Sequence, residues 1–187
     1  MSLTEHYRGI LSQFAATIPH NLKQVFHSNI KSTTNQKGGK EIMAKHIRNI
    51  SELAKALQPT LLQMVDTLAD RVEETLNYYL LDYYTGWTPS SYQRTQDFLH
   101  SAVKVDAHPY NGGVKASVYI DYESMDSYVN ATGFQVATFA NTGTHGGLSV
   151  KHKPHVWDDT MDKTVNNGTL LKLAIQYLKS QGISVRG

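Results

Sequence analysis

Residues 141–161 hold the densest group of side chains capable of chemistry, in the Gly-rich segment NTGTHGGLSVKHKPHVWDDTM. Five of them are types that bind divalent metals: His145, His152, His155, Asp158 and Asp159. A metal-dependent hydrolase is therefore the first chemistry to consider. A compact zinc site takes two ligands from one helical face or one tight turn, whereas Gly146, Gly147 and Pro154 separate these histidines. The spacing therefore does not favour a metal centre.

The adjacent aspartates have a simpler explanation. Asp158 and Asp159 follow Pro154 at the start of an expected helix. Carboxylates there interact favourably with the helix dipole and with the free amides of the first turn. This role needs no metal, so we predict a capped loop with neither metal nor cofactor, and we keep the hydrolase as an alternative.

Other catalytic patterns are missing from the sequence. It contains no G-x-S-x-G, P-loop, dinucleotide-binding fingerprint or H-E-x-x-H. Four acidic residues of an expected long helix are predicted to lie on its solvated face: Asp66, Asp70, Glu73 and Glu74. We therefore expect a protein that is not an enzyme.

Composition narrows the class of protein further. The 187 residues include no cysteine, which excludes disulfides, thiolate nucleophiles and Cys-based metal sites. The formal charge is only +2 and the basic residues are scattered, so specific nucleic-acid binding is not expected. No apolar run approaches the roughly twenty residues that span a bilayer. The composition predicts a soluble protein made in a cytoplasm.

The chain is predicted to divide near residue 42. Residues 4–18 carry one apolar helical stripe that Pro19 ends, and residues 31–40 are polar and Gly-containing, as linkers are. Residues 1–42 are therefore expected to form a helical extension and linker. Residues 43–187 are expected to form the main domain.

A long helix should open the main domain. Asn49 and Glu52 resemble a capping box, and apolar residues then hold one face as far as Tyr83. Pro59 either kinks this helix or begins its principal part. Residues 60–84 alone would extend ~37 Å, so part of the helix is expected to pack on a neighbouring molecule.

The remaining elements predict the fold class. Apolar and polar residues alternate in residues 99–107 and 114–122 around an Asn-Gly-Gly turn, which predicts an antiparallel hairpin. Residues 134–139 are expected to form a third strand, although a short helix fits almost as well. Residues 170–178 have a helical stripe closed by Gly182. The predicted fold is α+β, with the long helix and a C-terminal helix packed on a small antiparallel sheet.

Tyrosine is unusually frequent, with eleven residues against five Phe and two Trp. Six aromatic residues lie close together in sequence: Tyr78, Tyr79, Tyr83, Tyr84, Trp87 and Tyr92. Tyr and Trp combine a large rigid area with a polar tip, which is typical of protein interfaces. The alternative is that half of them cover the core at the end of the long helix.

The order of these features resembles a known family. The run from Tyr92 to Ser101, YQRTQDFLHS, is similar to a Y-x-R-T signature in neck proteins of long-tailed bacteriophages. An alternating strand follows, then His145-Gly146-Gly147, then a helix opening with Trp157. Residues 43–187 thus resemble the small head-tail connector, or tail-completion protein, of phages that infect low-GC Gram-positive hosts.

This resemblance implies a structural subunit of the virion neck. Such proteins form a ring, usually sixfold, between the head-closure complex and the tail tube. The implied partners are further copies of the chain, head-closure or adaptor proteins, and the tail tube or tail terminator, with DNA passing through the ring unread. A small monomeric or dimeric adaptor remains an alternative.

Two surfaces are then candidates for subunit contacts, because a ring subunit needs two different adhesive surfaces. They are the tyrosine end of the long helix and the Gly-rich loop. Arg94 is expected to fix the turn at residues 86–95 through hydrogen bonds to its carbonyls. The candidate interface residues are Tyr79, Tyr83, Tyr84, Trp87, Tyr92, Arg94, His145, Gly146, Gly147 and Trp157.

Overall fold

The computed structural model describes residues 50–85, 95–125, 131–145, 148–149 and 155–185. Two larger helices, α3 (Ile50–Thr85) and α6 (Thr169–Ser180), and the hairpin strands β1 (Ala102–Tyr110) and β2 (Gly113–Ile120) form the main body. The shorter elements are α4 (Gly133–Thr142), β3 (Thr144–His145), β4 (Leu148–Ser149), α5 (Val156–Met161) and the π-helix η1 (Asp162–Asn166). The predicted extension at residues 1–42 lies outside the described residues.

Helix α3 is the axis of the molecule. Its 36 residues run through Pro59, so the helix does not begin at that proline. Proline removes one intrahelical hydrogen bond, and apolar residues on both sides of Pro59 keep the same face packed. At 1.5 Å per residue, α3 is about 54 Å long. Every other large element of the described chain packs along it.

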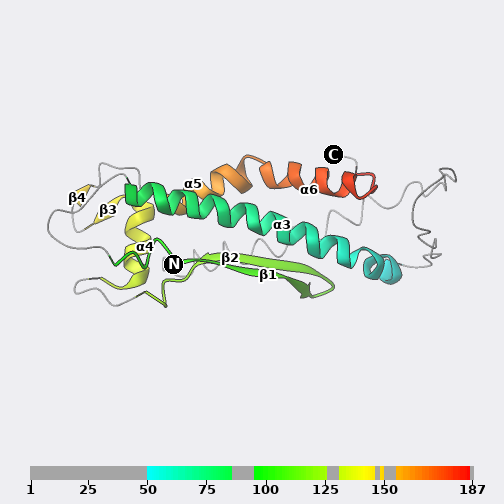
Figure 1. Cartoon of the computed structure of the whole chain (residues 1–187), viewed down its shortest axis with the longest axis horizontal. Coiled ribbons are helices and arrows are strands. Elements are labelled where there is room, and N and C mark those ends of the chain that lie inside the picture. The colour runs from blue at the N-terminus through cyan, green and yellow to red at the C-terminus, as the bar shows by residue number, and fades with distance from the viewer. Residues whose placement is uncertain (1–49, 86–94, 126–130, 146–147, 150–154, 186–187) are drawn as a thin grey trace, which may run out of the picture.

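The elements form three layers, of which α3 is the middle one. The β1–β2 hairpin covers one side of the helix, and α5, η1 and α6 cover the other (Figure 1). The α+β class and the long helix are therefore confirmed. The C-terminal helix α6 packs on α3 and not directly on the sheet as the sequence had predicted, because α3 lies between the sheet and α6 (Figure 1).

The hairpin forms around the predicted turn, but β1 begins and ends three residues later than the predicted strand at 99–107. Ala102 pairs with Ile120, and Tyr110 pairs with Gly113, in an antiparallel register with an irregularity between Val105 and His108. Asn111 and Gly112 have φ values of 46° and 77°, as the commonest two-residue hairpin turn requires. The turn chemistry in the sequence was therefore sufficient to place this element.

The prediction of a third strand at residues 134–139 is wrong, and the helical alternative is right. Thr132 caps α4, because the Gln135 N–H donates to Thr132 Oγ1 at 3.3 Å and the Thr132 N–H donates to Gln135 Oε1 at 2.8 Å. Gly143, at φ 76°, ends the helix. This reciprocal capping box starts the helix. From the sequence, the β-branched and aromatic residues of 134–139 had favoured a strand.

The core lies at the C-terminal half of α3. Its buried residues come from α3, the turn before β1, the segment after β2, α4 and α5: Leu76, Leu80, Phe98, Met125, Ala140 and Val156. Gly133 is part of this packing, because a Cβ there would lie 2.2 Å from the Tyr122 carbonyl oxygen. The end of the molecule that carries α4 is therefore fixed mainly by apolar burial.

The C-terminal helices continue this layer. Thr160 and Thr164 are fully buried, and their hydroxyls donate to the carbonyls of Val156 and Thr160 at 2.7 and 2.6 Å. Gly182, at φ 75°, follows the end of α6 as predicted. Tyr177 on α6 donates from its hydroxyl to Gln63 Oε1 at 3.0 Å, which joins α6 to α3.

Candidate interaction surfaces

Three of the candidate interface tyrosines pack within the subunit. Tyr79, Tyr83 and Tyr84 are half-buried against the core. Phe98 meets the Tyr83 ring edge-to-face, with centroids 5.5 Å apart, and lies 6.5 Å from the Tyr84 ring. This arrangement fits the alternative in which tyrosines cover the core. An interface role for their exposed edges stays a prediction.

The Tyr79 hydroxyl lies in a setting that favours its neutral form. Burial raises the pKa of Tyr79, and the negative charge of Asp159 on α5 raises it further. The phenol therefore stays protonated well into the alkaline range. Its position between α3 and α5 adds to the apolar packing of the core end.

A buried asparagine organises the base of the Gly-rich segment. Asn141 Oδ1 accepts hydrogen bonds from the Trp157 N–H at 2.9 Å and the Asp158 N–H at 3.0 Å. Its carbonyl oxygen lies 2.8 Å from His155 Nδ1. Asn141 thus closes the loop between α4 and α5 and caps α5. Asp158 and Asp159 lie in the first turn of α5 as expected, but Asn141 rather than the aspartates binds the first amides.

The other candidates of this segment are placed only in part. Trp157 is half-buried against the core. His145 pairs through its backbone with Leu148 in the β3–β4 pair. Gly146 and Gly147 lie outside the described residues, as do Trp87, Tyr92 and Arg94. The predicted role of Arg94 at the turn therefore stays a prediction.

The metal-binding alternative gains no site in the described part of the chain. No group of three His, Cys, Asp or Glu side chains there is placed to hold an ion. His155 directs Nδ1 to the Asn141 carbonyl, and Asp158 and Asp159 lie in the first turn of α5. His152 lies outside the described residues.

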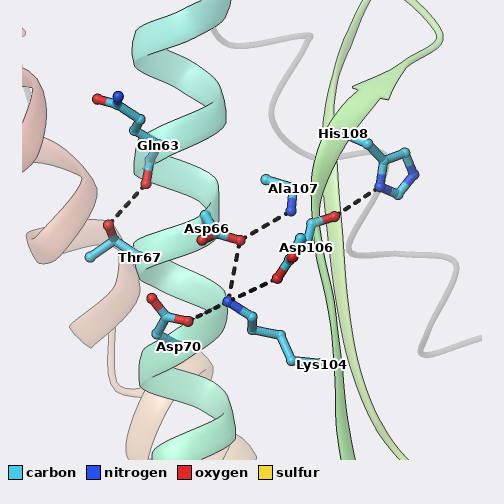
Figure 2. A network of polar contacts seen from close by, with 8 residues as sticks. All are labelled: Gln63, Asp66, Thr67, Asp70, Lys104, Asp106, Ala107 and His108. Atoms are coloured by element: carbon cyan, nitrogen blue, oxygen red, sulfur yellow. Dashed lines mark hydrogen bonds and ion pairs between the residues drawn. The ribbon is translucent and has the colours of Figure 1, made fainter.

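A charged network joins the hairpin to α3 (Figure 2). Lys104 Nζ lies 2.5 Å from Asp70 Oδ1, 3.3 Å from Asp66 Oδ1 and 3.2 Å from Asp106 Oδ1. The Ala107 N–H donates to Asp66 Oδ1 at 3.1 Å. Only 15% of the Lys104 side chain is exposed. We call these residues, with Ala107, the polar joint.

The expected solvated role of Asp66 and Asp70 is only part of their role: their side chains are 36% and 49% exposed, and both also bind Lys104. Residues four apart share one face of a helix, and here that face meets β1. The irregularity after Val105 turns Asp106 and the Ala107 amide toward α3. Glu74 does lie exposed, where it pairs with Arg71 at 3.6 Å. The sequence showed only the charges of these residues, not which side of α3 the hairpin would cover.

The network holds Lys104 firmly in its charged form. Its hydrogen bond to Asp70 raises the pKa of Lys104 above the ordinary range, and the bonds to Asp106 and Asp66 add to this against the opposing effect of burial. The ammonium therefore stays charged at every physiological pH. The polar joint acts as a permanent ionic contact between the two layers.

Two exposed apolar areas lie elsewhere on the described surface. On α3, Tyr78 is 63% exposed and Leu81 52% exposed. On the hairpin, Val105 is 40% exposed and Tyr110 45% exposed. Taking each area together with one charged residue, we name them the helix patch (Glu74, Tyr78 and Leu81) and the hairpin patch (Val105, Tyr110 and Lys115). Exposed apolar groups that are rimmed by charge are typical of interaction sites.

Sequence reasoning missed both patches, although a signal for each was present. Tyr78 and Leu81 fall outside the apolar stripe of α3, and residues off the stripe face away from the core. In β1, Lys104 faces α3, so Val105 beside it must face away. The alternating apolar residues of β1 therefore mark the outer face of the hairpin.

None of the described helices is long and apolar enough to cross a membrane. Residues 49–180 match the model of the YomN family, a phage-type, Bacillus prophage-like family. The matched stretch covers well over half of the chain and includes all of α3 and every element from β1 to α6. No curated protein and no solved structure matches the chain significantly.

Proposed function

The chain belongs to the YomN family and is thus a phage-type protein, and on this premise we propose that it is a structural protein of the phage neck. In this role it forms a ring that joins the head-closure complex to the tail tube. One observation carries the proposal: the family match at residues 49–180 lies within residues 43–187, which resemble neck connectors. The two lines of likeness are of different kinds and meet on the same domain.

The shape and surface of the subunit support a ring. A ring of identical subunits uses heterologous contacts, in which one surface of a copy meets a different surface of the next. The described chain has two unlike exposed areas, the helix patch on α3 and the hairpin patch on the outer face of the adjacent hairpin.

The proposed role is structural and requires no catalysis. Lys104 pairs with Asp66 and Asp70 within the subunit. Asn141 Oδ1 accepts a hydrogen bond from the first turn of α5. Further copies of the chain, head-closure or adaptor proteins, and the tail tube or tail terminator are the proposed partners. The protein would reside in the virion neck.

Deleting the gene from a phage genome that encodes this protein tests the proposal. We expect filled heads and finished tails to accumulate separately, because the joint between them is missing. Supplying the gene in trans should restore joined particles, and antibody labelling should then mark the neck in electron micrographs. Normal joining in the deletion strain would overturn the proposed function.

A second arm separates a structural role from the hydrolase alternative. The purified protein is analysed for bound zinc and manganese, and its thermal unfolding is followed with and without EDTA. A structural protein should keep the same melting temperature with the chelator. Stoichiometric metal, together with a fall of many degrees on adding EDTA, would favour the hydrolase instead.

A further inference from the structure

The helix patch combines apolar area with negative charge. Glu74 and Asp82 lie one helical turn before and one turn after Tyr78, so both carboxylates flank that ring on one face of α3. The Arg71–Glu74 pair is 3.6 Å apart and its side chains are 50% and 69% exposed, so solvent weakens it. Glu74 can therefore exchange Arg71 for another cation at little cost.

The hairpin patch combines apolar area with positive charge. Lys115 Nζ lies 5.1 Å from the centroid of the Tyr110 ring, which places the ammonium on the same outer face as Tyr110. His108 pairs with Lys115 across the strands and adds a second basic group to this face. The hairpin patch is thus opposite in charge to the helix patch.

The two patches are far apart on one subunit. The polar joint places the middle of β1 beside Asp66 and Asp70, and the hairpin turn points from there toward the N-terminal half of α3 (Figure 1). Tyr78 lies twelve residues beyond Asp66 in the other direction, about 18 Å along the helix. A single subunit therefore cannot bring its own two patches together.

We propose that the helix patch of one copy binds the hairpin patch of the next copy, with Glu74 meeting Lys115. Like patches would bring like charges together, so a symmetric pairing of either patch with itself is disfavoured. Unlike patches on different layers give a head-to-tail contact that repeats, which closes into a ring when the rotation allows. This inference rests on the proposed ring and names the surfaces that build it.

The chain contains no cysteine, so engineered cysteines report a contact without background. The double variant Glu74→Cys/Lys115→Cys, treated with a short bismaleimide at high protein concentration, should give a ladder of covalent oligomers on a denaturing gel. Mixing the two single variants should give one dimer band. Gln176→Cys/Lys115→Cys is the matched control, because Gln176 is exposed on α6 outside both patches, and it should give monomer.

Charge reversal tests the same contact without a cross-linker. Lys115→Glu or Glu74→Lys alone should weaken self-association, measured by sedimentation velocity, roughly fivefold or more because an attraction becomes a repulsion. The double variant Lys115→Glu/Glu74→Lys should recover most of that loss, since the charges oppose again. Equal weakening in the single and double variants would show that these charges do not meet.

Other results would overturn the contact. Dimers from Glu74→Cys alone would show a symmetric pairing of helix patches. The absence of a ladder from the double cysteine variant would show that the two patches do not contact each other. If the deletion strain separates heads from tails and the ladder is absent, the neck function stands and this contact falls. A ladder combined with normal joining in the deletion strain retains the contact and removes the neck role.

Discussion

Two regions of the subunit, the core end and the polar joint at the middle of α3, are held by different physical interactions. At the core end, Leu76, Leu80 and Phe98 are almost completely buried and pack against α4 and α5. At the polar joint, Lys104 meets three carboxylates whose side chains are 36% to 84% exposed. Burial of apolar area is strong and not directional, whereas ion pairs are directional and weak when water reaches them.

We expect the two regions to have different roles, one in the stability of the fold and the other in the orientation of the hairpin on α3. The core end should supply most of the free energy that keeps the described domain folded, because each large buried side chain contributes about 1.5–3 kcal/mol. The polar joint should instead fix how the hairpin lies on α3 and so where the hairpin patch points. Four variants, in order of falling effect, test that division.

The largest effect is expected from Phe98→Ala. Phe98 is 1% exposed and contacts Tyr83 and Tyr84, so its removal leaves a cavity at the centre of the core end. We expect the free energy of unfolding to fall by about 3–5 kcal/mol, measured by urea denaturation. Phe98→Leu, which keeps most of the volume, should cost much less. A loss below about 1 kcal/mol would place the core elsewhere.

Asn141→Ala should have the next largest effect. It removes the acceptor for the Trp157 and Asp158 amides in a place where only 5% of Asn141 is exposed. Unpaired amides at the start of α5 should lower the free energy of unfolding by about 1–3 kcal/mol. Asn141→Asp keeps the acceptor and adds a charge that suits a helix N-terminus, so it is the control. Equal losses in both variants would argue against a capping role.

Elements whose signals are local were predictable from the sequence. The Asn111-Gly112 turn and the residues on either side of it placed the hairpin, and Gly182 marked the end of α6. The apolar stripe placed the long helix α3, although the sequence left open whether that helix begins at Pro59. In each case the residues that determine the structure are near neighbours in the chain, so one sequence suffices.

Features that depend on distant partners were not predictable. Phe134, Val136 and Phe139 have strand-like composition, which outweighed the helical spacing and the local Thr132–Gln135 capping box of α4. Asp66 and Lys104 are 38 positions apart, so nothing local showed that they would meet. The inner face of β1 also depends on this contact, because Lys104 lies against α3 where it meets the carboxylate of Asp70.

Lys104→Met should lower the free energy of unfolding less than Asn141→Ala does at neutral pH. The pH dependence of this loss distinguishes an ionic contact from packing. The pKa of Lys104 is raised in the folded protein, so its stabilisation is fully present below about 10.4, the unfolded value, and is lost as pH rises further. The raised pKa of Tyr79 acts in both proteins and cancels in the difference.

The measurement compares the two melting temperatures between neutral pH and pH values above about 10.4. The wild type should be the more stable at neutral pH, and the gap should narrow in the alkaline range. Added salt should narrow it as well, because the partner carboxylates are half-exposed. Met keeps the apolar stem, so packing changes little. A gap that is independent of both pH and salt would show that Lys104 acts through packing alone.

The smallest effect on stability is expected from Tyr78→Ser/Leu81→Ser. Both side chains are more than half exposed on α3, so the free energy of unfolding should change by no more than about 0.5 kcal/mol per site. In the background of Glu74→Cys/Lys115→Cys, the same pair of substitutions should abolish the covalent ladder, because the apolar centre of the contact is gone. A loss near 2 kcal/mol would instead place these residues in the core of the subunit, and the contrast between a stabilising end and an exposed adhesive face would fail.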